Sequence, residues 1–270
     1  MSGFPKTNIF VLYFNGMDSV VKIVAVSYSN TYPFVYGIEN SGVMDAFQLQ
    51  LVHPMACAES FISGNADIAL LPVGALKLLP EHRIITDMCI GAVNEVKSVL
   101  LVSKKPLNEI RSIALDTESA TSVRLCKVLA ANYWKIEPEW EAVQVIDYKD
   151  FPETDAFVVI GDKAFELAPH FSYVYDLAGE WHQYTGLPFV FAVWVSKPDV
   201  SEAFIQKLNE ALQYGVVHIA EVVAHFNNQF HGNFDLENYL TECIDYRFDE
   251  KKRESLEKFL GLIGKEFVNL

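Results

Sequence analysis

The chain has 270 residues, of which 51% are hydrophobic and 13% aromatic, so it can build one large domain or two lobes with real cores. Its 21 Lys and Arg residues against 35 Asp and Glu residues give a net charge of −14. This acidic excess argues against nucleic acid as a partner, because phosphate contacts need clustered cations. A small anionic ligand stays possible, since one lysine or a helix N-terminus can bind it locally.

Residues 1–19 are expected to be an N-terminal extension, because the patterned core begins after them. The apolar run Ile9–Phe14 is too short for a signal-peptide core, no small-residue cleavage site follows it, and Met17 is a candidate natural start. No run reaches the ~18–20 apolar residues of a membrane span. We therefore expect a cytoplasmic protein with no membrane partner.

The cysteines are widely spaced and form no Cys-x-x-Cys pair; they are Cys57, Cys89, Cys126 and Cys243. This spacing predicts four buried or half-buried thiols in a reducing compartment.

Short β-rich runs alternate with helical stretches along the chain. Strands are expected at 20–26, 47–52, 68–73, 83–90, 112–115, 143–147, 157–160 and 173–176. Helices are expected at 33–39, 55–62 and 119–135, and the pattern is helical from Ser201 onward. Strand, helix and strand in this rhythm indicate βαβ units, and therefore an α/β fold with largely parallel pairing.

Two buried strand runs echo each other. Residues 99–104 (Val-Leu-Leu-Val-Ser-Lys) and 191–197 (Phe-Ala-Val-Trp-Val-Ser-Lys) both end in Val-Ser-Lys. The ending is either a coincidence or the mark of two strands that leave one lobe and return to it. On the second interpretation, 104–190 form an inserted lobe, and 20–103 together with 191–270 form the first lobe. Two crossings make a hinge, with a cleft that can close on a ligand.

A polar loop follows the first predicted strand, where ligands lie in open α/β folds. It is Ser27-Tyr-Ser-Asn-Thr31, and it leads into Pro33, a good first-turn residue. Asn30 and Thr31 carry hydrogen-bond donors and acceptors. The loop is a candidate binding segment, and a simple helix N-cap is the alternative.

Three further segments lie at comparable places. Asp116-Thr-Glu-Ser-Ala-Thr-Ser122 crowds hydroxyls at a helix start, which favours a bound carboxylate or phosphate, with capping as the alternative. Val96-Lys97-Ser98 precedes a crossing strand, where the lysine neutralises an anion or is simply solvated. Ile160-Gly161-Asp162 ends a strand; its glycine permits close backbone approach, and its aspartate is a polar anchor or an N-cap.

Several motifs are absent from the sequence. It contains no Gly-x-Gly-x-x-Gly, no Gly-x-x-x-x-Gly-Lys-Ser/Thr and no Gly-x-Ser-x-Gly, and its seven histidines have no metal-ligand spacing. We expect no metal site, and any chemistry must depend on how the ligand is positioned.

The motifs together resemble the menaquinone-biosynthesis family that contains chorismate dehydratase, the first enzyme of the futalosine route. The resemblance covers about Lys22 to about Lys197. Its stretches are Ser27–Thr31 with Pro33, Ala66–Val73, Val96–Val99, Leu115–Val123, Ile160–Asp162, Asp176-Leu177 with Trp181, and Thr185–Ala192. The last run, Thr-Gly-Leu-Pro-Phe-Val-Phe-Ala, is the most specific and favours the dehydratase over the sister enzyme that makes dihydroxynaphthoate. The family usually has an apolar residue at Ser29 and often a larger or basic residue at Ala120.

The resemblance implies a two-lobed periplasmic-binding-protein-like (type II) α/β fold with two crossover hinge strands and a helical C-terminal segment. It also implies a hydro-lyase that converts chorismate to 3-[(1-carboxyvinyl)oxy]benzoate without metal or cofactor. Asn30 would orient the ring or the leaving hydroxyl, while Ser98 and the hydroxyl cluster of Ser119, Thr121 and Ser122 would bind carboxylate. The base would be the substrate's own enolpyruvyl carboxylate, with Asp116 and Asp162 as alternatives. The remaining expected substrate-binding residues are Ser29, Thr31, Lys97 and Gly161.

Two other functions stay open. A non-catalytic binding protein for a small carboxylate uses the same fold, although such proteins usually carry an export signal, and none is recognised here. A sister enzyme of the dihydroxynaphthoate-synthase type is the other. The sequence leaves open whether the chain is a monomer or a homodimer.

Overall fold

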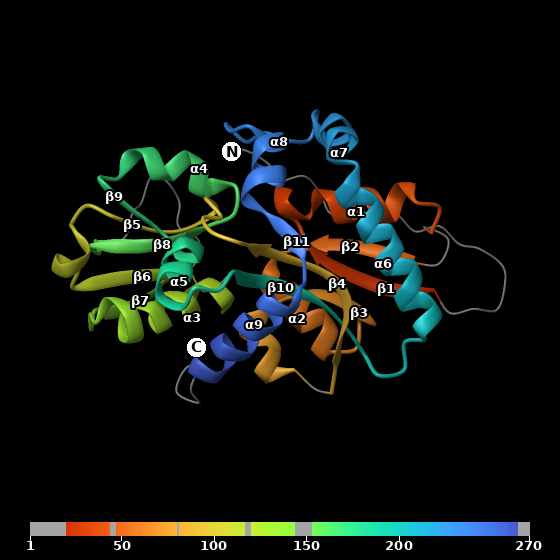
Figure 1. Cartoon of the computed structure of the whole chain (residues 1–270), viewed down its shortest axis with the longest axis horizontal. Helices are drawn as coiled ribbons and strands as arrows, with labels where there is room; N and C mark the ends of the chain where they lie inside the picture. Colours follow the sequence, from red (N-terminus) through yellow and green to blue (C-terminus); the bar gives the residue numbers. More distant parts are fainter. Residues whose placement is uncertain (1–19, 44–46, 80, 117–119, 144–152, 264–270) are drawn as a thin grey trace.

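The computed structural model describes residues 20–43, 47–79, 81–116, 120–143 and 153–263. These residues form two mixed sheets, of six and five strands, that lie side by side along the long axis of the molecule (Figure 1). We call the six-stranded sheet with its helices the first lobe and the five-stranded sheet with its helices the second lobe. The expected two-lobed α/β architecture is confirmed, and the expected extension over 1–19 lies outside the described residues.

The first sheet has the strand order β11-β4-β10-β3-β1-β2. Its strands are β1 (Val21–Val26), β2 (Phe47–Val52), β3 (Ile68–Pro72), β4 (Arg83–Ala92), β10 (Phe189–Ser196) and β11 (Asp245–Arg247). β1 pairs in parallel with β2 and β3, whereas β10 is antiparallel to both β3 and β4. Every residue of β3 and β10 is buried, as expected of strands covered on both faces.

The second sheet repeats this pattern in the order β7-β6-β8-β5-β9. Its strands are β5 (Val99–Ser103), β6 (Ser112–Asp116), β7 (Glu139–Val143), β8 (Ala156–Ile160) and β9 (Tyr173–Asp176). β6 is parallel to β7 and β8, and β5 is antiparallel to β8 and β9. Of the strand expected at 143–147, only Val143 lies within the described residues, where it ends β7; the rest of that prediction falls in residues 144–152, outside the described part.

The echo between residues 99–104 and 191–197 reflects equivalent positions in two different sheets. Each sheet places three parallel strands beside one antiparallel strand, which is β10 in the first sheet and β5 in the second. The placement of Val99–Ser103 in the first lobe was therefore wrong, because this strand pairs with β8 and β9. A fully buried run shows that a strand is covered but not which sheet it joins. The chain crosses between the sheets at residues 93–98 and again at 186–188.

The helices pack on these sheets or on one another, and α1, α2 and α3 begin within one residue of their predicted starts. They are α1 (Tyr32–Asn40), α2 (Pro54–Ile62), α3 (Ala120–Leu129), α4 (Lys163–Leu167), α5 (Leu177–Thr185), α6 (Glu202–Val217), α7 (Ile219–Phe226), α8 (Leu236–Asn238) and α9 (Glu250–Leu262). Proline stands in the first turn of α1 and of α2, where its missing N–H costs nothing. The predicted long helix at 119–135 is α3, continued by a π-helical turn over Ala130–Trp134.

Two glycines allow α1 and α6 to touch backbone to backbone. A Cβ on Gly37 would lie 1.9 Å from the Ala211 carbonyl oxygen, and one on Gly215 would lie 1.7 Å from the Pro33 carbonyl oxygen. No side chain fits at these distances. The helix that follows the Ser29–Thr31 segment is therefore held tightly against the body of the first lobe.

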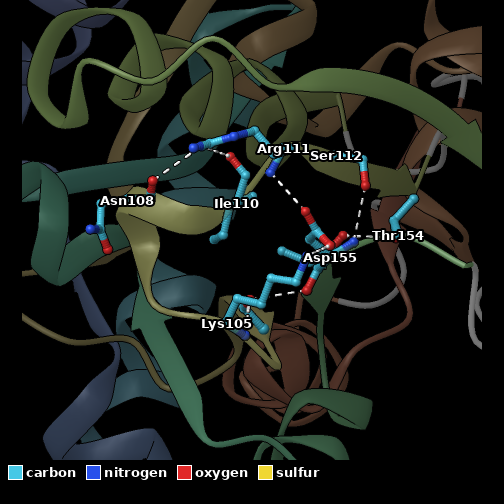
Figure 2. A network of polar contacts seen from close by, with 9 residues as sticks. Lys105, Asn108, Ile110, Arg111, Ser112, Thr154 and Asp155 are labelled. Carbon is cyan, nitrogen blue, oxygen red and sulfur yellow. Dashed lines mark hydrogen bonds and ion pairs between the residues drawn. The ribbon is translucent and has the colours of Figure 1, made fainter.

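A polar network fastens the end of the second sheet where β6 and β8 begin (Figure 2). The Asp155 carboxylate accepts a hydrogen bond of 2.8 Å from the Arg111 main-chain N–H and lies 2.6 Å from the Lys105 ammonium nitrogen. The Ser112 hydroxyl accepts a bond of 3.0 Å from the Asp155 N–H. These contacts hold the pKa of Asp155 below its usual value, with the Lys105 hydrogen bond as the main cause. The network supports the sheet at the end opposite to residues 161 and 162.

The four cysteines are free and buried, as the spacing predicted. Burial raises the pKa of the Cys57 thiol to about 12, so it stays protonated near neutral pH. In the described part of the chain, no group of three or more His, Cys, Asp and Glu side chains is arranged to hold a metal ion. Within the same residues, no helix combines the length and apolar character that crossing a membrane requires.

Candidate functional site

The candidate site lies between the lobes, where β1 and β8 end. Ser29 follows β1 in the short 3₁₀ segment Ser29–Thr31, and Asp162 follows β8. The Ser29 hydroxyl donates a hydrogen bond of 2.5 Å to Oδ1 of Asp162. Burial raises the pKa of Asp162, and the bond from Ser29 opposes that rise. Two loops chosen from sequence therefore meet, although 133 positions separate them.

Gly161 lets the two loops approach. Its φ of +66° lies in the left-handed region, and a Cβ there would lie 2.9 Å from the ring of Tyr28. Its N–H donates a hydrogen bond of 2.8 Å to the Ser98 carbonyl oxygen. Close backbone approach at Gly161 was predicted, and in this structure the first-lobe tyrosine is what approaches.

Asn30 and Ser98 are joined through a tyrosine from the part of the chain that follows β10, residues 197–263, which we call the C-terminal segment. The Tyr239 hydroxyl donates a hydrogen bond of 2.7 Å to Oγ of Ser98 and accepts one of 3.4 Å from Nδ2 of Asn30. The Thr31 hydroxyl donates to Oδ1 of Asn30 over 3.2 Å, and the Tyr246 hydroxyl donates to the Asn30 carbonyl oxygen over 3.0 Å. Three predicted residues thus belong to one network, and both tyrosines were missed.

The first crossing between the lobes is anchored by an aspartate. Oδ2 of Asp176 accepts main-chain hydrogen bonds from Val96 (3.0 Å) and Lys97 (2.7 Å), while its Oδ1 caps α5. Burial raises the pKa of this carboxyl, and the main-chain bonds oppose the rise. Lys97 has a φ of 61° and an exposed side chain. The crossing is therefore held through the main chain of Lys97, beside the Ser98 of the site.

The start of α3 packs against the first lobe. The Thr121 hydroxyl donates to the Phe191 carbonyl oxygen (3.1 Å) and accepts from the Gly74 N–H (3.0 Å). A Cβ on Gly74 would lie 2.5 Å from the Ala120 carbonyl oxygen. In this structure the Thr121 hydroxyl serves the contact between lobes. Ser122 is buried next to it.

The side chains of the other two residues predicted at this helix start, Ser119 and Asp116, lie outside the described part of the structure. Residues 117–119, which include Ser119, lie outside the described residues, and nothing is described of the Asp116 side chain, although its main chain ends β6.

Arg124 is a buried cation near this contact that the sequence analysis did not select. It is 4% exposed, and its Nη1 donates a hydrogen bond of 3.0 Å to the same Ala120 carbonyl oxygen that faces Gly74. Burial lowers the pKa of the guanidinium. Among the described residues no acidic side chain forms an ion pair with it, and a guanidinium suits a carboxylate.

Aromatic rings close the site on the side of the C-terminal segment. Phe165 of α4 stacks on Phe234 with ring centroids 3.7 Å apart, and its edge contact with Tyr239 spans 5.0 Å. Phe234 also meets Tyr239 edge to face at 5.4 Å. The second lobe thus contacts the C-terminal segment at the Tyr239 ring.

A hollow of about 980 Å³ lies between the first crossing and β11, and it reaches the network only at Tyr246 among the residues named above. Its lining includes Glu95, Glu242, Asp245 and Arg247 and none of the predicted site residues. The hydrogen-bonding side chains that meet between the lobes, among them Ser29, Asn30 and Ser98, make a better candidate site than this hollow.

The sequence is similar to curated enzymes along most of its length. Residues 21–265 match the family described as menaquinone biosynthesis. The chain is 27% identical over 268 residues to a chorismate dehydratase of Thermus thermophilus, covering 89% of this chain and 94% of that one. It is 30% identical over 177 residues to a chorismate dehydratase of Campylobacter jejuni, covering 64% of this chain and 66% of that one.

Solved structures show the same fold at low identity. A protein of Archaeoglobus fulgidus matches with a TM-score of 0.69 and 14% identity, over 90% of this chain and 96% of that one. A Candida albicans gene product described as having the generic periplasmic binding protein fold matches with a TM-score of 0.64 and 12% identity, over 92% and 93%. These likenesses confirm the periplasmic-binding-protein-like fold. Because the family match extends from β1 to beyond α9, the chain belongs to the menaquinone biosynthesis family.

Proposed function

We propose that this chain is a chorismate dehydratase, a hydro-lyase that converts chorismate to 3-[(1-carboxyvinyl)oxy]benzoate and water at the start of futalosine-route menaquinone biosynthesis. The observation that carries the proposal is the likeness to a chorismate dehydratase over 94% of that enzyme's length. The cluster of neutral donors around Asn30 and Ser98 supports it, because a substrate with two carboxylates needs such donors.

The reaction requires the protein to position the substrate and to stabilise the charge that develops on it. The ring carbon that bears the enolpyruvyl ether loses its proton, and the neighbouring carbon loses its hydroxyl group as hydroxide. The electron pair of the broken C–H bond completes the aromatic ring, and the proton and hydroxide become water. Aromatisation supplies the driving force, so a base held near the C–H bond and donors near the leaving hydroxyl suffice.

The proposed roles follow from donors and acceptors. Asn30 and Ser98 donate hydrogen bonds to the leaving hydroxyl or to a carboxylate. The start of α3, with Ser119, Ser122 and the nearby Arg124, binds the other carboxylate. The proton acceptor is the substrate's own enolpyruvyl carboxylate, and Asp162 and Asp116 are the alternatives.

Substrate entry requires the lobes to part. Ser29 and Ser98 are each only 1% exposed, and the Ser29–Asp162 and Thr121–Phe191 bonds join the two lobes around them. We propose that these contacts break to admit chorismate and form again around it, which excludes water during the reaction.

Incubation of the purified protein with chorismate tests the proposal. The ultraviolet spectrum should change from that of the ring diene to that of an aryl ether, with a product lighter by one water in the mass spectrum. Asn30→Ala should lower turnover by more than about tenfold while the fold is retained, which circular dichroism checks. Asn40→Ala is the matched control, because the Asn40 side chain is exposed and bonds only to the Tyr36 carbonyl oxygen among the described residues.

Absence of conversion by the wild type would overturn the dehydratase proposal. If chorismate nevertheless raised the melting temperature, a binding protein would be indicated. If a naphthoate-like carboxylate raised it more, the sister enzyme would be indicated.

A further inference from the structure

The Tyr239 hydroxyl stands between the two side chains to which the proposed function assigns hydrogen bonds with substrate. Its single proton is donated to Oγ of Ser98 over 2.7 Å, and a lone pair accepts the Asn30 amide over 3.4 Å. Tyr239 is 2% exposed. The residue therefore touches both Asn30 and Ser98 from a buried position, far from either in sequence.

This arrangement determines the direction in which Ser98 can donate. A serine hydroxyl has one proton and two lone pairs, and one lone pair of Ser98 already receives the proton of Tyr239. The Ser98 proton must then point away from the phenol. The Ser98 main chain is fixed as well, since its carbonyl oxygen accepts the Gly161 N–H over 2.8 Å. The Ser98 hydroxyl can therefore donate its proton to an acceptor outside this network.

The three groups form a chain of donors in one direction, from the Asn30 amide through the Tyr239 phenol to the Ser98 hydroxyl. Each bond in such a chain polarises the next, which strengthens the donor at its end. The chain requires a neutral phenol, because an ionised one has no proton to donate. Burial raises the pKa of Tyr239 well above its usual value, so the phenol stays protonated across the neutral range.

The ring of Tyr239 is held between one aromatic ring of the second lobe and one of its own C-terminal segment. Phe165 of α4 and Phe234 of the C-terminal segment both meet it edge to face. Because Phe165 lies three residues after Asp162, the same stretch of the second lobe contacts Ser29 and supports the Tyr239 ring.

We infer that Tyr239 is a positioning residue that orients the Ser98 hydroxyl as a hydrogen-bond donor toward the substrate. The inference rests on the proposed function and deepens it. Tyr239 itself does not contact the reacting atoms. Its effect on turnover passes through Ser98, with Asn30 at the other end of the chain.

A double-mutant cycle tests the inference. Tyr239→Phe keeps the ring between Phe165 and Phe234 and removes the hydroxyl, so we expect kcat on chorismate to fall by at least about tenfold. Ser98→Ala should cause a loss of similar size, and the double variant should lose little more than either single variant. Losses that multiply in the double variant would show a general structural effect and overturn the inference.

The control is Tyr175→Phe. The Tyr175 hydroxyl accepts a hydrogen bond of 2.9 Å from the Leu107 N–H in the second lobe, away from the site. This variant loses the same atom and should keep kcat within about twofold. If Tyr239→Phe does not fold, 3,5-difluorotyrosine at position 239 keeps both the hydroxyl and the shape while making the phenol a stronger donor. An unchanged kcat in that protein would overturn the inference.

Measurements on the wild type distinguish failure of the inference about Tyr239 from failure of the proposed function. If the wild type converts chorismate while Tyr239→Phe retains kcat within about twofold, only the inference about Tyr239 falls. If it neither converts nor binds chorismate, the proposed function falls and the inference falls with it. If it binds chorismate without converting it, the double-mutant cycle is repeated with the dissociation constant as the readout. Additive losses of binding free energy in the double variant would then overturn the inference.

Discussion

Ser29 of the first lobe donates a 2.5 Å hydrogen bond to the carboxylate of Asp162 in the second lobe. The bond joins the ends of β1 and β8, one strand from each sheet. It also places a half-buried carboxylate in the candidate site. The properties of this pair therefore bear on both stability and catalysis.

The ionised Asp162 is expected to lower stability at neutral pH. Burial raises its pKa above 3.8, so the folded state holds the proton more tightly than the unfolded state does. Its contribution to the free energy of unfolding then falls as pH rises from 3.8 through the folded value. Asp162→Asn keeps an acceptor for the Ser29 hydroxyl and removes the charge. We expect a melting temperature at pH 7 equal to or above that of the wild type, and a lower one would contradict this account.

The same variant tests the role of Asp162 in proton transfer. A general base contributes about 10²–10⁴-fold to a rate. Because we propose the substrate's own carboxylate as the base, Asp162→Asn should lower kcat on chorismate by less than about tenfold. A loss beyond about a hundredfold would instead identify Asp162 as the proton acceptor.

Asp155→Asn offers a matched comparison with the opposite pH dependence. The pKa of Asp155 is lowered by Lys105 and by the Arg111 N–H, so its stabilising contribution is present above 3.8 and is lost as pH falls below it. The variant should melt below the wild type at pH 7, by a few degrees at most since Lys105 is exposed, and the difference should shrink in acid. Its kcat should be unchanged, because Asp155 precedes β8 whereas Asp162 follows it. A loss of kcat would show that the two ends of the sheet are coupled.

Thr121→Val removes the hydroxyl that joins α3 to the first lobe. The change leaves the buried Gly74 N–H and Phe191 carbonyl oxygen without this partner, at a cost of about 1–3 kcal/mol in the free energy of unfolding. Urea denaturation measures it. Thr241→Val is the control, because within the described part of the chain the exposed Thr241 hydroxyl bonds only within its own helical turn. Its loss should cost less than about 0.5 kcal/mol. Equal costs in the two variants would contradict a specific contact between lobes.

Gly215→Ala tests the crossing of α1 and α6. The added Cβ would lie 1.7 Å from the Pro33 carbonyl oxygen, so the helices must separate, and we expect a loss of at least about 2 kcal/mol in the free energy of unfolding. Gly261→Ala in α9 is the matched control, since among the described residues no atom outside the adjacent helix backbone lies within 4 Å of its Cβ position. There alanine should stabilise the helix by about 0.5–1 kcal/mol. Similar effects at both sites would rule out the close packing of α1 on α6.

The residues of the site were predictable where they follow strands. A buried run that stops at a polar group identifies both a strand end and a loop, so Ser29, Asn30 and Asp162 could be selected from local pattern. Tyr239 and Tyr246 could not, because a tyrosine in an apolar tail has the same pattern whether it fills a core or directs its hydroxyl to a site. Arg124 was missed for a related reason, since one arginine in a helix resembles any solvated cation.

The sequence by itself determined the α/β class, most strands in chain order and the loops that carry the polar groups, because each depends on burial and chain geometry within a few residues. It missed β11, because the three residues of this edge strand lie in a segment predicted to be helical from Ser201 onward. Only the tertiary structure decided that Val99–Ser103 joins the second sheet, that Ser29 reaches Asp162, and that Tyr239 lies between Asn30 and Ser98. Strand pairing and side-chain contact join residues far apart in the chain. Their selection depends on how whole lobes pack, which no local pattern records.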